Sequence, residues 1–210
     1  MDDNGAVEGK GHDRESAMLE AVTASRPSAE IVKKKSSLLA IIKERSLKKG
    51  SFRLASGAMS DYYLDMKPTT FSPDGSALLS QIICAMLADE PDVTAIGGLE
   101  LGAVPIIAAV CAESSKGRPI FGFVVRKQRK GHGTDKKIDG NFRPNSTVVL
   151  IDDVTTKGGS VMQAVDAVRE HGAKVKKIIT VVDRGEGAEG RLREAGITLV
   201  PIFTTRDVLG

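Results

Sequence analysis

The feature that most constrains this chain is the run from Val148 to Ser160, which combines a short strand, a polar loop and the start of a helix. Four apolar residues, Val148 to Ile151, are typical of a buried parallel strand. Beyond the loop, apolar residues recur on one helical face, at Val161, Ala164, Val165 and Val168. A buried strand that leads directly into an amphipathic helix predicts an α/β fold.

The loop between this strand and this helix predicts an anion site. Backbone N–H groups at the start of a helix lack partners within the helix and, with the helix dipole, attract phosphate. Gly158 and Gly159 would let the backbone approach such a group, and hydroxyl donors come from Thr155, Thr156 and Ser160. The pattern is neither a Walker A loop, because the lysine precedes the glycines, nor the Gly-x-Gly-x-x-Gly fingerprint.

Two adjacent carboxylates, Asp152 and Asp153, end the predicted strand. They would repel a phosphate, so we expect them to accept hydrogen bonds or to face positive charge. A phosphate site beside two such acids suits a ribose 5-phosphate, with the sugar diol on the carboxylates. The alternative interpretation is an ordinary strand-to-helix turn with a solvated acid pair.

The remaining sequence predicts one domain behind a polar extension. Residues 1–29 are glycine-containing and poorly periodic, so we expect a disordered or loosely helical extension. Residues 30–210 are predicted to form a single domain, with a small hood lobe over about 30–70 and a core over about 71–210. Strands and helices alternate in the core, which predicts a parallel sheet flanked by helices, with strands near 93–98, 120–125, 148–151, 178–182 and 199–203.

The hood lobe is expected to contain a helix and a hairpin. The helix is predicted to end near Gly50, with Lys48 and Lys49 on its exposed side. Alternating apolar residues then predict two short strands around a turn at 56–57. Tyr62 and Tyr63 lie in the second strand, and the pattern fits ordinary packing and a lid over a planar substrate equally well.

A basic, glycine-containing stretch follows the strand at 120–125. From Arg126 to Arg143 there are seven basic residues and two acids. Such a run is usually a solvated face, and RNA binding is a second interpretation. Its position between strands of an α/β unit favours a mobile lid that binds polyphosphate, with His132 as a phosphate ligand.

Arg184 follows the predicted strand at 178–182. An arginine at the carboxyl end of a parallel strand points into the cleft of an open sheet. The alternative for Arg184 is a surface ion pair, which is our interpretation of Arg191 and Arg193 on the next predicted helix.

Composition excludes several classes of protein. Apolar and charged contents of 41% and 27% are those of a globular protein, and a net charge of +3 is too small to argue for nucleic acid. No apolar run approaches the ~20 residues of a membrane span, and the N-terminus lacks a secretory signal. Cys84 and Cys111 are predicted to be buried free thiols, with a disulfide or a metal-binding pair as the alternative. We therefore expect a cytoplasmic protein with neither nucleic acid nor membrane as a partner.

The stretch 148–160 resembles the motif with which type I phosphoribosyltransferases bind 5-phosphoribosyl-1-diphosphate (PRPP). Residues from about 38 to 205 resemble the orotate phosphoribosyltransferases of that family, on Phe-x-Leu-x-Ser-Gly with Tyr-Tyr at 52–63, Arg-Lys-x-x-Lys-x-His-Gly at 126–133, and Asp183-Arg184. The resemblance implies a type I phosphoribosyltransferase-like parallel sheet flanked by helices, with a small N-terminal hood lobe. It also implies that PRPP and orotate give orotidine 5′-monophosphate and diphosphate in UMP biosynthesis, with Mg²⁺ held mainly through the diphosphate.

The resemblance further implies roles for individual residues. The ribose hydroxyls would bind Asp152 and Asp153, which with Lys130 form the catalytic set. The 5-phosphate would lie on Val154, Thr155, Thr156, Lys157, Gly158, Gly159 and Ser160. The diphosphate would contact Arg126, Lys127, Lys130 and His132, and orotate would contact Thr156, Arg184, Tyr62 and Tyr63. The loop 126–140 would reach the neighbouring site of a homodimer.

This chain departs from the family pattern at a few positions. Ala55 stands where many members have lysine, and the loop around Leu101 lacks a PRPP-contacting lysine of other members; Lys67 is a candidate substitute. Lys157 and Gly159 stand where other members often have Ala or Gly and then Thr. These departures affect the details of PRPP binding and leave the reaction class unchanged.

Two other functions compete with orotate transfer. A purine phosphoribosyltransferase would share the PRPP motif but gives no reason for Arg184 or for the His-Gly of the basic loop. A regulatory protein that senses PRPP and binds nucleic acid would need a basic surface outside the site. The lysines of residues 33–49 are the candidates for such a surface.

Overall fold

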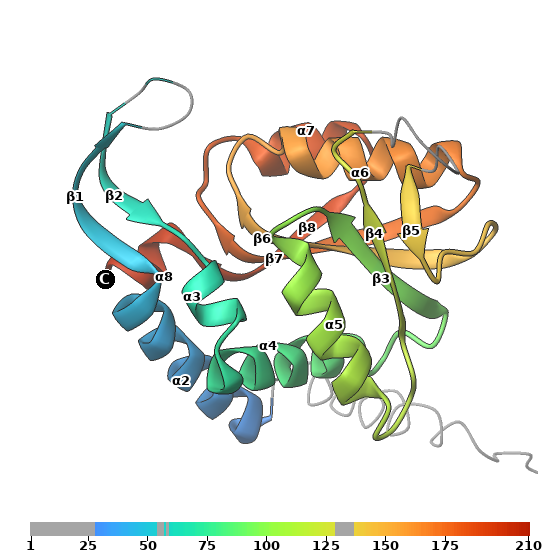
Figure 1. The fold of residues 1–210 in the computed structure, drawn as a ribbon, viewed down its shortest axis with the longest axis horizontal. Coiled ribbons are helices and arrows are strands. Elements are labelled where there is room, and N and C mark those ends of the chain that lie inside the picture. Colours follow the sequence, from blue (N-terminus) through green and yellow to red (C-terminus); the bar gives the residue numbers. More distant parts are fainter. Residues whose placement is uncertain (1–27, 54–56, 58, 129–136) are drawn as a thin grey trace, which may run out of the picture. The chain divides into compact units, whose positions relative to one another are not determined.

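The computed structural model describes residues 28–53, 57, 59–128 and 137–210 (Figure 1). Apart from its last two residues, the predicted extension 1–29 lies outside this described part. Residues 34–210 form one compact unit, which contains a six-stranded and a two-stranded sheet.

The six-stranded sheet has the order β5-β4-β3-β6-β7-β8. Its strands are β3 (Val93–Leu99), β4 (Phe121–Val125), β5 (Ile138–Gly140), β6 (Thr147–Thr155), β7 (Lys174–Asp183) and β8 (Thr198–Thr204). All neighbours are parallel except β4 and β5. The predicted parallel α/β sheet is therefore confirmed, while the expectation that 126–140 is wholly a loop is wrong at Ile138–Gly140. Three residues are too few to show a period of two, so this edge strand left no pattern in the sequence.

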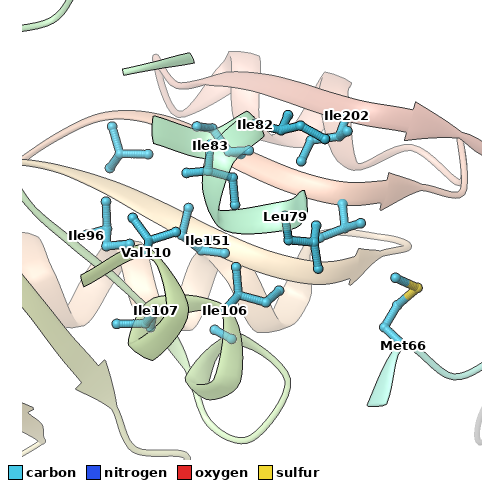
Figure 2. Close-up of a cluster of buried hydrophobic side chains, with 14 of the residues drawn as sticks. Met66, Leu79, Ile82, Ile83, Ile96, Ile106, Ile107, Val110, Ile151 and Ile202 are labelled. Carbon is cyan, nitrogen blue, oxygen red and sulfur yellow. The ribbon is translucent and has the colours of Figure 1, made fainter. Parts of the chain in front are cut away.

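Helices cover both faces of this sheet. Figure 1 shows α4 (Pro73–Met86) and α5 (Ala103–Ser114) on one side, and α6 (Gly159–Glu170) and α7 (Ala188–Glu194) on the other. Strand β6 alternates between the two layers: Val149 and Ile151 join the cluster of α4 and α5, whereas Val148 and Leu150 pack with α6 and α7. Figure 2 shows the first cluster, in which Ile151 lies among side chains of α4 and α5. Both faces of β6 are buried, which explains its continuous apolar run.

The hood contains α2 (Ala29–Arg45), the hairpin of β1 (Leu47–Arg53) and β2 (Met59–Leu64), and the short helix α3 (Lys67–Thr70). The two strands pair antiparallel, which confirms the hairpin. The predicted helix end at Gly50 is wrong, because Lys48 and Lys49 belong to β1. Buried Ser46 ends the helix: its hydroxyl lies 2.7 Å from that of Thr69, and its carbonyl accepts a hydrogen bond from the Asp65 N–H. This tertiary contact overrides a lysine-rich sequence that suits a helix.

The chain ends in α8 (Thr205–Leu209), which begins with a capping box between Thr204 and Asp207. Cys84 and Cys111, on α4 and α5, are half-buried free thiols, and burial raises the pKa of both. Within the described ranges, no helix is long and apolar enough to cross a membrane.

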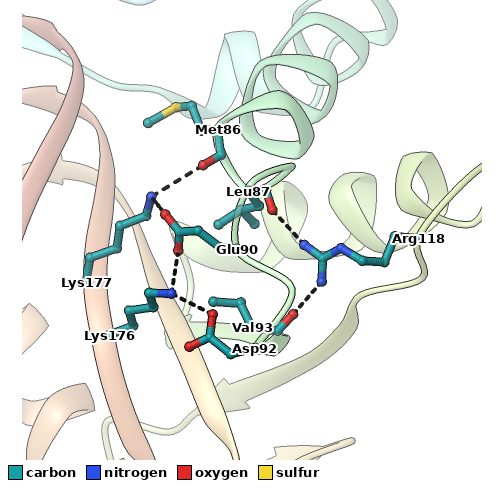
Figure 3. Close-up of polar contacts among 8 residues, drawn as sticks. All are labelled: Met86, Leu87, Glu90, Asp92, Val93, Arg118, Lys176 and Lys177. Carbon is teal, nitrogen blue, oxygen red and sulfur yellow. Dashed lines mark hydrogen bonds and ion pairs between the residues drawn. The ribbon is translucent and has the colours of Figure 1, made fainter. Parts of the chain in front are cut away.

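A polar network fastens the turn after α4 to the neighbouring strands (Figure 3). Arg118 donates hydrogen bonds to the carbonyls of Leu87 and Val93, at 2.7 and 2.6 Å. Lys177 of β7 reaches the carbonyl of Met86 and forms an ion pair with Glu90. The last carbonyls of a helix lack partners within it, so these cations stabilise the end of α4.

We predict that Lys177→Met lowers the free energy of unfolding by roughly 2–3 kcal/mol, because it removes the nearer of the two lysines that pair with the largely buried Glu90 carboxylate and leaves it with Lys176, at 3.7 Å. Lys174→Met is the matched control, since it makes the same change on the exposed end of the same strand. Urea unfolding at pH 7 measures both variants. Equal midpoints for the two would show that the ion pair contributes nothing.

Candidate active site

The sheet has a topological switch point between β3 and β6. The chain leaves β3 through α5 on one face and leaves β6 through α6 on the other, while the two strands lie side by side. In open α/β sheets, ligands bind outside the carboxyl ends of the strands at such a point. Asp152, Asp153 and the loop that follows them lie there.

Strand β6 runs farther than the sequence indicated. It continues through both acids to Thr155, where Thr155 pairs with Asp183 of β7. The loop before α6 is therefore only Thr156, Lys157 and Gly158. Gly158 caps the helix with a φ of +75°, which a residue with a Cβ adopts only with strain. The N–H groups of the first turn of α6 adjoin this loop, at the position where the sequence predicts an anion site.

The loop after β3 packs directly on the acid pair. A Cβ at Gly102 would lie 2.4 Å from the carboxylate carbon of Asp153, and a Cβ at Gly98 would lie 2.3 Å from the carbonyl oxygen of Ile151. The peptide between Glu100 and Leu101 in the same loop is cis. Only glycine allows this approach, so the backbone at Gly102 fixes where the Asp153 carboxylate can lie.

We predict that Gly102→Ala lowers kcat/KM of a reaction at this site at least tenfold while the fold stays intact, because the new methyl group must displace the Asp153 carboxylate. Gly117→Ala is the control, since a Cβ there meets nothing within 4 Å. Steady-state kinetics measures the activity of both variants, and circular dichroism checks that both are folded. Unchanged kinetics for Gly102→Ala would show that the contact does not position Asp153.

The two carboxylates differ in their surroundings. Burial raises the pKa of Asp152 to about 7; the hydroxyl of Thr155, 2.7 Å from Oδ2, lowers this pKa and the charge of Asp153 raises it. Burial also raises the pKa of Asp153, against which the Val154 N–H (2.9 Å to Oδ1) and the charge of Lys67 act. Both groups therefore carry their negative charge at a cost, as expected for acids that face a ligand rather than bulk water.

Thr155 was predicted to donate its hydroxyl to a phosphate, and the structure places it elsewhere. Its side chain is buried inside β6, with its hydroxyl between Asp152 and Thr180 of β7. Thr180 was not predicted as part of the site. The signal was a single threonine within the apolar strand Ile178 to Val182, where a hydroxyl requires a partner.

Lys67 lies where the sequence suggested a substitute cation. It begins α3, its Nζ lies 2.6 Å from Oδ1 of Asp65, and its charge acts on Asp153. The hood thus contributes a cation beside the acid pair.

Arg184, after β7, lies close to Tyr62 of β2, although the two residues are far apart in the sequence. The guanidinium carbon of Arg184 lies 4.9 Å from the centre of the Tyr62 ring, and its Nε lies 2.9 Å from Oε1 of Glu186. The Arg184 side chain is 10% exposed, and its backbone N–H donates to the carbonyl of Thr155. Arg184 therefore adjoins the end of β6, as its position after β7 predicted.

Tyr63 does not join this group. Successive residues of a strand point to opposite faces, and Tyr63 packs against Phe52, with ring centres 5.7 Å apart. Of the two adjacent tyrosines, Tyr62 is the one that faces Arg184.

The basic loop is anchored at both of its described ends. Arg126 forms an ion pair with Asp139 of β5, and the backbone N–H of Lys127 donates to Oε1 of Glu100 at 2.8 Å. Lys137 donates to the carbonyl of Lys127 at 2.9 Å. Arg126 and Lys127 thus lie beside the loop after β3, whereas the predicted ligands Lys130 and His132 lie outside the described residues.

Comparison with known proteins agrees with this geometry. The phosphoribosyl transferase domain family matches residues 74–195, more than half of the chain, so the switch-point loop and acid pair define a phosphoribosyltransferase. Orotate phosphoribosyltransferase from Bradyrhizobium sp. is 43% identical over 177 residues, which are 82% of this chain and 95% of that protein. The chain belongs to the orotate phosphoribosyltransferase family.

Solved structures agree as well. The orotate phosphoribosyltransferase of Mycobacterium tuberculosis, crystallised with Fe(III) dicitrate, superposes with a TM-score of 0.75 at 34% identity, over 83% of this chain and 98% of that chain. The same enzyme in complex with PRPP gives a TM-score of 0.68 at 28% identity, over 84% of this chain and 92% of that chain.

Proposed function

We propose that this protein transfers the 5-phosphoribosyl group of PRPP to orotate, which yields orotidine 5′-monophosphate and diphosphate in UMP biosynthesis. The observation that carries the proposal is the placement of a largely buried arginine, Arg184, beside Tyr62 and next to Thr155, where β6 ends and the loop 156–158 begins. A related enzyme of the family binds PRPP.

The donor substrate fits the switch point. Its 5-phosphate would lie on the loop of Thr156, Lys157 and Gly158 and on the first turn of α6, where free N–H groups and the helix dipole favour an anion. The ribose hydroxyls would donate to Asp152 and Asp153. Breaking the bond from C1 to the diphosphate oxygen leaves positive charge on the sugar, which these two carboxylates stabilise electrostatically.

The acceptor substrate fits the neighbouring strand end. The guanidinium of Arg184 can donate two parallel hydrogen bonds to the carboxylate of orotate, while its Nε forms an ion pair with Glu186. Orotate would lie against Tyr62 and within reach of Thr156. Its ring nitrogen bonds to C1 as the bond from C1 to the diphosphate breaks, and its proton passes to the departing diphosphate. Because no covalent intermediate with the protein is needed, catalysis consists mainly of positioning and charge stabilisation.

The leaving group would be held by cations. Arg126 and Lys127 lie at the base of the basic loop, and Lys130 and His132 follow them in sequence. Mg²⁺ binds phosphate oxygens and keeps water ligands, so it needs no protein cage, and within the described ranges no three His, Cys, Asp or Glu side chains are grouped to hold a metal ion. Bound through the diphosphate, Mg²⁺ would neutralise charge on the leaving group.

Assembly and location belong to the same proposal. The protein acts as a homodimer in which the loop 126–140 of one subunit completes the site of the other. It works in the cytoplasm, where thiols such as Cys84 and Cys111 stay reduced.

The test is the absorbance of orotate after protein, PRPP and Mg²⁺ are mixed with it, with adenine, hypoxanthine and uracil assayed in parallel. We expect orotate to be the only one of the four bases that is consumed, and its consumption to require both PRPP and Mg²⁺. Turnover of a purine instead would retain the PRPP site and contradict the role of Arg184. PRPP binding without turnover of any base would favour a regulatory protein.

A further inference from the structure

Three oxygen-bearing groups form a continuous chain beneath the acid pair. The Thr155 hydroxyl lies 2.7 Å from Oδ2 of Asp152 and 3.0 Å from the hydroxyl of Thr180, which in turn lies 3.2 Å from the carbonyl oxygen of Val182. Thr155 is 1% exposed and Thr180 is 0% exposed, so water cannot replace a missing partner. The chain therefore leads from the carboxylate at the cleft into the buried interior between β6 and β7.

This series of hydrogen-bonding groups has two protonation states, which differ by the proton on Asp152. Each hydroxyl has one proton to donate. When Asp152 is ionised, Thr155 donates to the carboxylate. When Asp152 is protonated, its O–H donates to Thr155, Thr155 donates to Thr180, and Thr180 donates to the Val182 carbonyl. In the protonated form each of the three contacts has a proton. In the ionised form Thr155 donates to the carboxylate and Thr180 to the Val182 carbonyl, so the contact between the two threonine hydroxyls has no proton.

We infer that Thr155 and Thr180 are positioning residues, a buried hydroxyl pair that holds the Asp152 carboxyl group toward the ribose and sets the pH above which it acts as an ionised acceptor. The inference rests on the proposed function, because it assigns the ribose to Asp152. Neither threonine touches a substrate in this arrangement. Thr155 is thereby removed from the set of 5-phosphate ligands.

The charges near Asp152 do not favour its ionised form, so we assign the control of its pKa to the threonines. In the part of the chain that the structure describes, the charged group that acts on Asp152 is Asp153, whose carboxylate opposes ionisation. From the hood, Lys67 and Asp65 act on Asp153 with opposite signs. From β7, the neighbouring group is the uncharged hydroxyl of Thr180. Among the described residues, the groups that favour the ionised form of Asp152 are the Thr155 hydroxyl and, with a smaller effect, the backbone N–H of Asp153.

The two threonines should respond oppositely to replacement by valine, which has the same shape without the hydroxyl. In Thr155→Val the ionised carboxylate loses its donor, so the pKa of Asp152 rises by about one pH unit, the effect of one charge-assisted hydrogen bond. In Thr180→Val the protonated state loses the acceptor for Thr155, so this pKa falls. Thr155→Ser keeps the hydroxyl and should behave like the wild type.

The experiment is a carbon-13 NMR titration of aspartate carboxyl groups in the full chain, with Asp152→Asn to assign the signal. The pH dependence of kcat/KM for PRPP is measured on the same proteins. We expect opposite shifts for the two valine variants in both measurements, with the serine variant unchanged. Valine variants that titrate like the wild type, or that lose rate equally at every pH, would overturn the inference.

The two readouts separate this inference from the proposed function. NMR reports the titration of Asp152 directly. It is measured without orotate or PRPP, so the titration of PRPP itself does not contribute. Opposite NMR shifts in a protein that transfers nothing to orotate would support the hydroxyl pair and overturn the substrate assignment.

Discussion

Arg184→Ala is expected to raise KM for orotate roughly a hundredfold to a thousandfold while the affinity for PRPP changes little. Two charge-assisted hydrogen bonds to one carboxylate contribute on the order of 3–4 kcal/mol, and each 1.4 kcal/mol is a factor of ten. The Arg184 side chain is 10% exposed, so truncation also leaves the bound orotate carboxylate without a partner where little water can reach it.

Matched variants separate charge, geometry and packing. Arg184→Lys keeps the charge and loses the fork, so it should recover only part of the affinity. Arg193→Ala removes an exposed arginine from α7 and should behave like the wild type. Calorimetric binding of PRPP to each variant provides the control for the donor site. If Arg184→Ala weakened PRPP and orotate equally, Arg184 would be a structural residue and not the orotate ligand.

Asp152→Asn is expected to lower kcat/KM for PRPP roughly a hundredfold or more and at the same time to stabilise the protein. The activity falls because an amide cannot offer negative charge to the developing ribosyl cation. The stability rises because burial, which raises the pKa of Asp152 to about 7 from an ordinary value of 3.8, disfavours the charged form in the folded protein.

The sign of this stability effect depends on pH. Below pH 3.8 the carboxyl group is protonated in the folded and unfolded chain, so the two proteins should be equally stable. Between pH 4 and 7 the unfolded chain ionises and the folded chain does not, so the wild type loses stability relative to the variant. Above pH 7 the difference is constant, on the order of 2–4 kcal/mol.

Thermal unfolding of both proteins at pH 4 and pH 8 measures this difference. A higher Tm for the variant at pH 8, with the gap much reduced at pH 4, is the expected pattern. Loss of stability at pH 8 would mean that Asp152 is a structural partner in the fold. Inactivity combined with greater stability is the usual mark of a residue kept for function.

The sequence predicted the parts of the site that depend on the ends of parallel strands. Such strand ends fall on one edge of the sheet, so their positions in the sequence are enough to bring Asp152, Asp153 and Arg184 near one another. The hairpin and both layers of helices were predicted from the periodicity of apolar residues. Tyr62 could not be separated from Tyr63, because the choice depends on which face of β2 turns toward the core.

What the sequence did not predict depends on contacts between distant segments. Nothing around Gly50 indicates that α2 ends at Arg45, since Ser46 is held by Thr69 and Asp65. Thr155 looked like a loop residue because the strand extends beyond its apolar run. Its partner Thr180 lies on another strand, and that pairing becomes visible only when β6 and β7 are side by side.

The most direct test of the proposed function is a crystal structure of the protein with orotate, Mg²⁺ and a PRPP analogue that cannot react. We predict the orotate carboxylate on the guanidinium of Arg184, the ribose hydroxyls on Asp152 and Asp153, and the 5-phosphate at the start of α6. Orotate bound away from Arg184, or a phosphate that contacts the acid pair in place of the ribose, would contradict it.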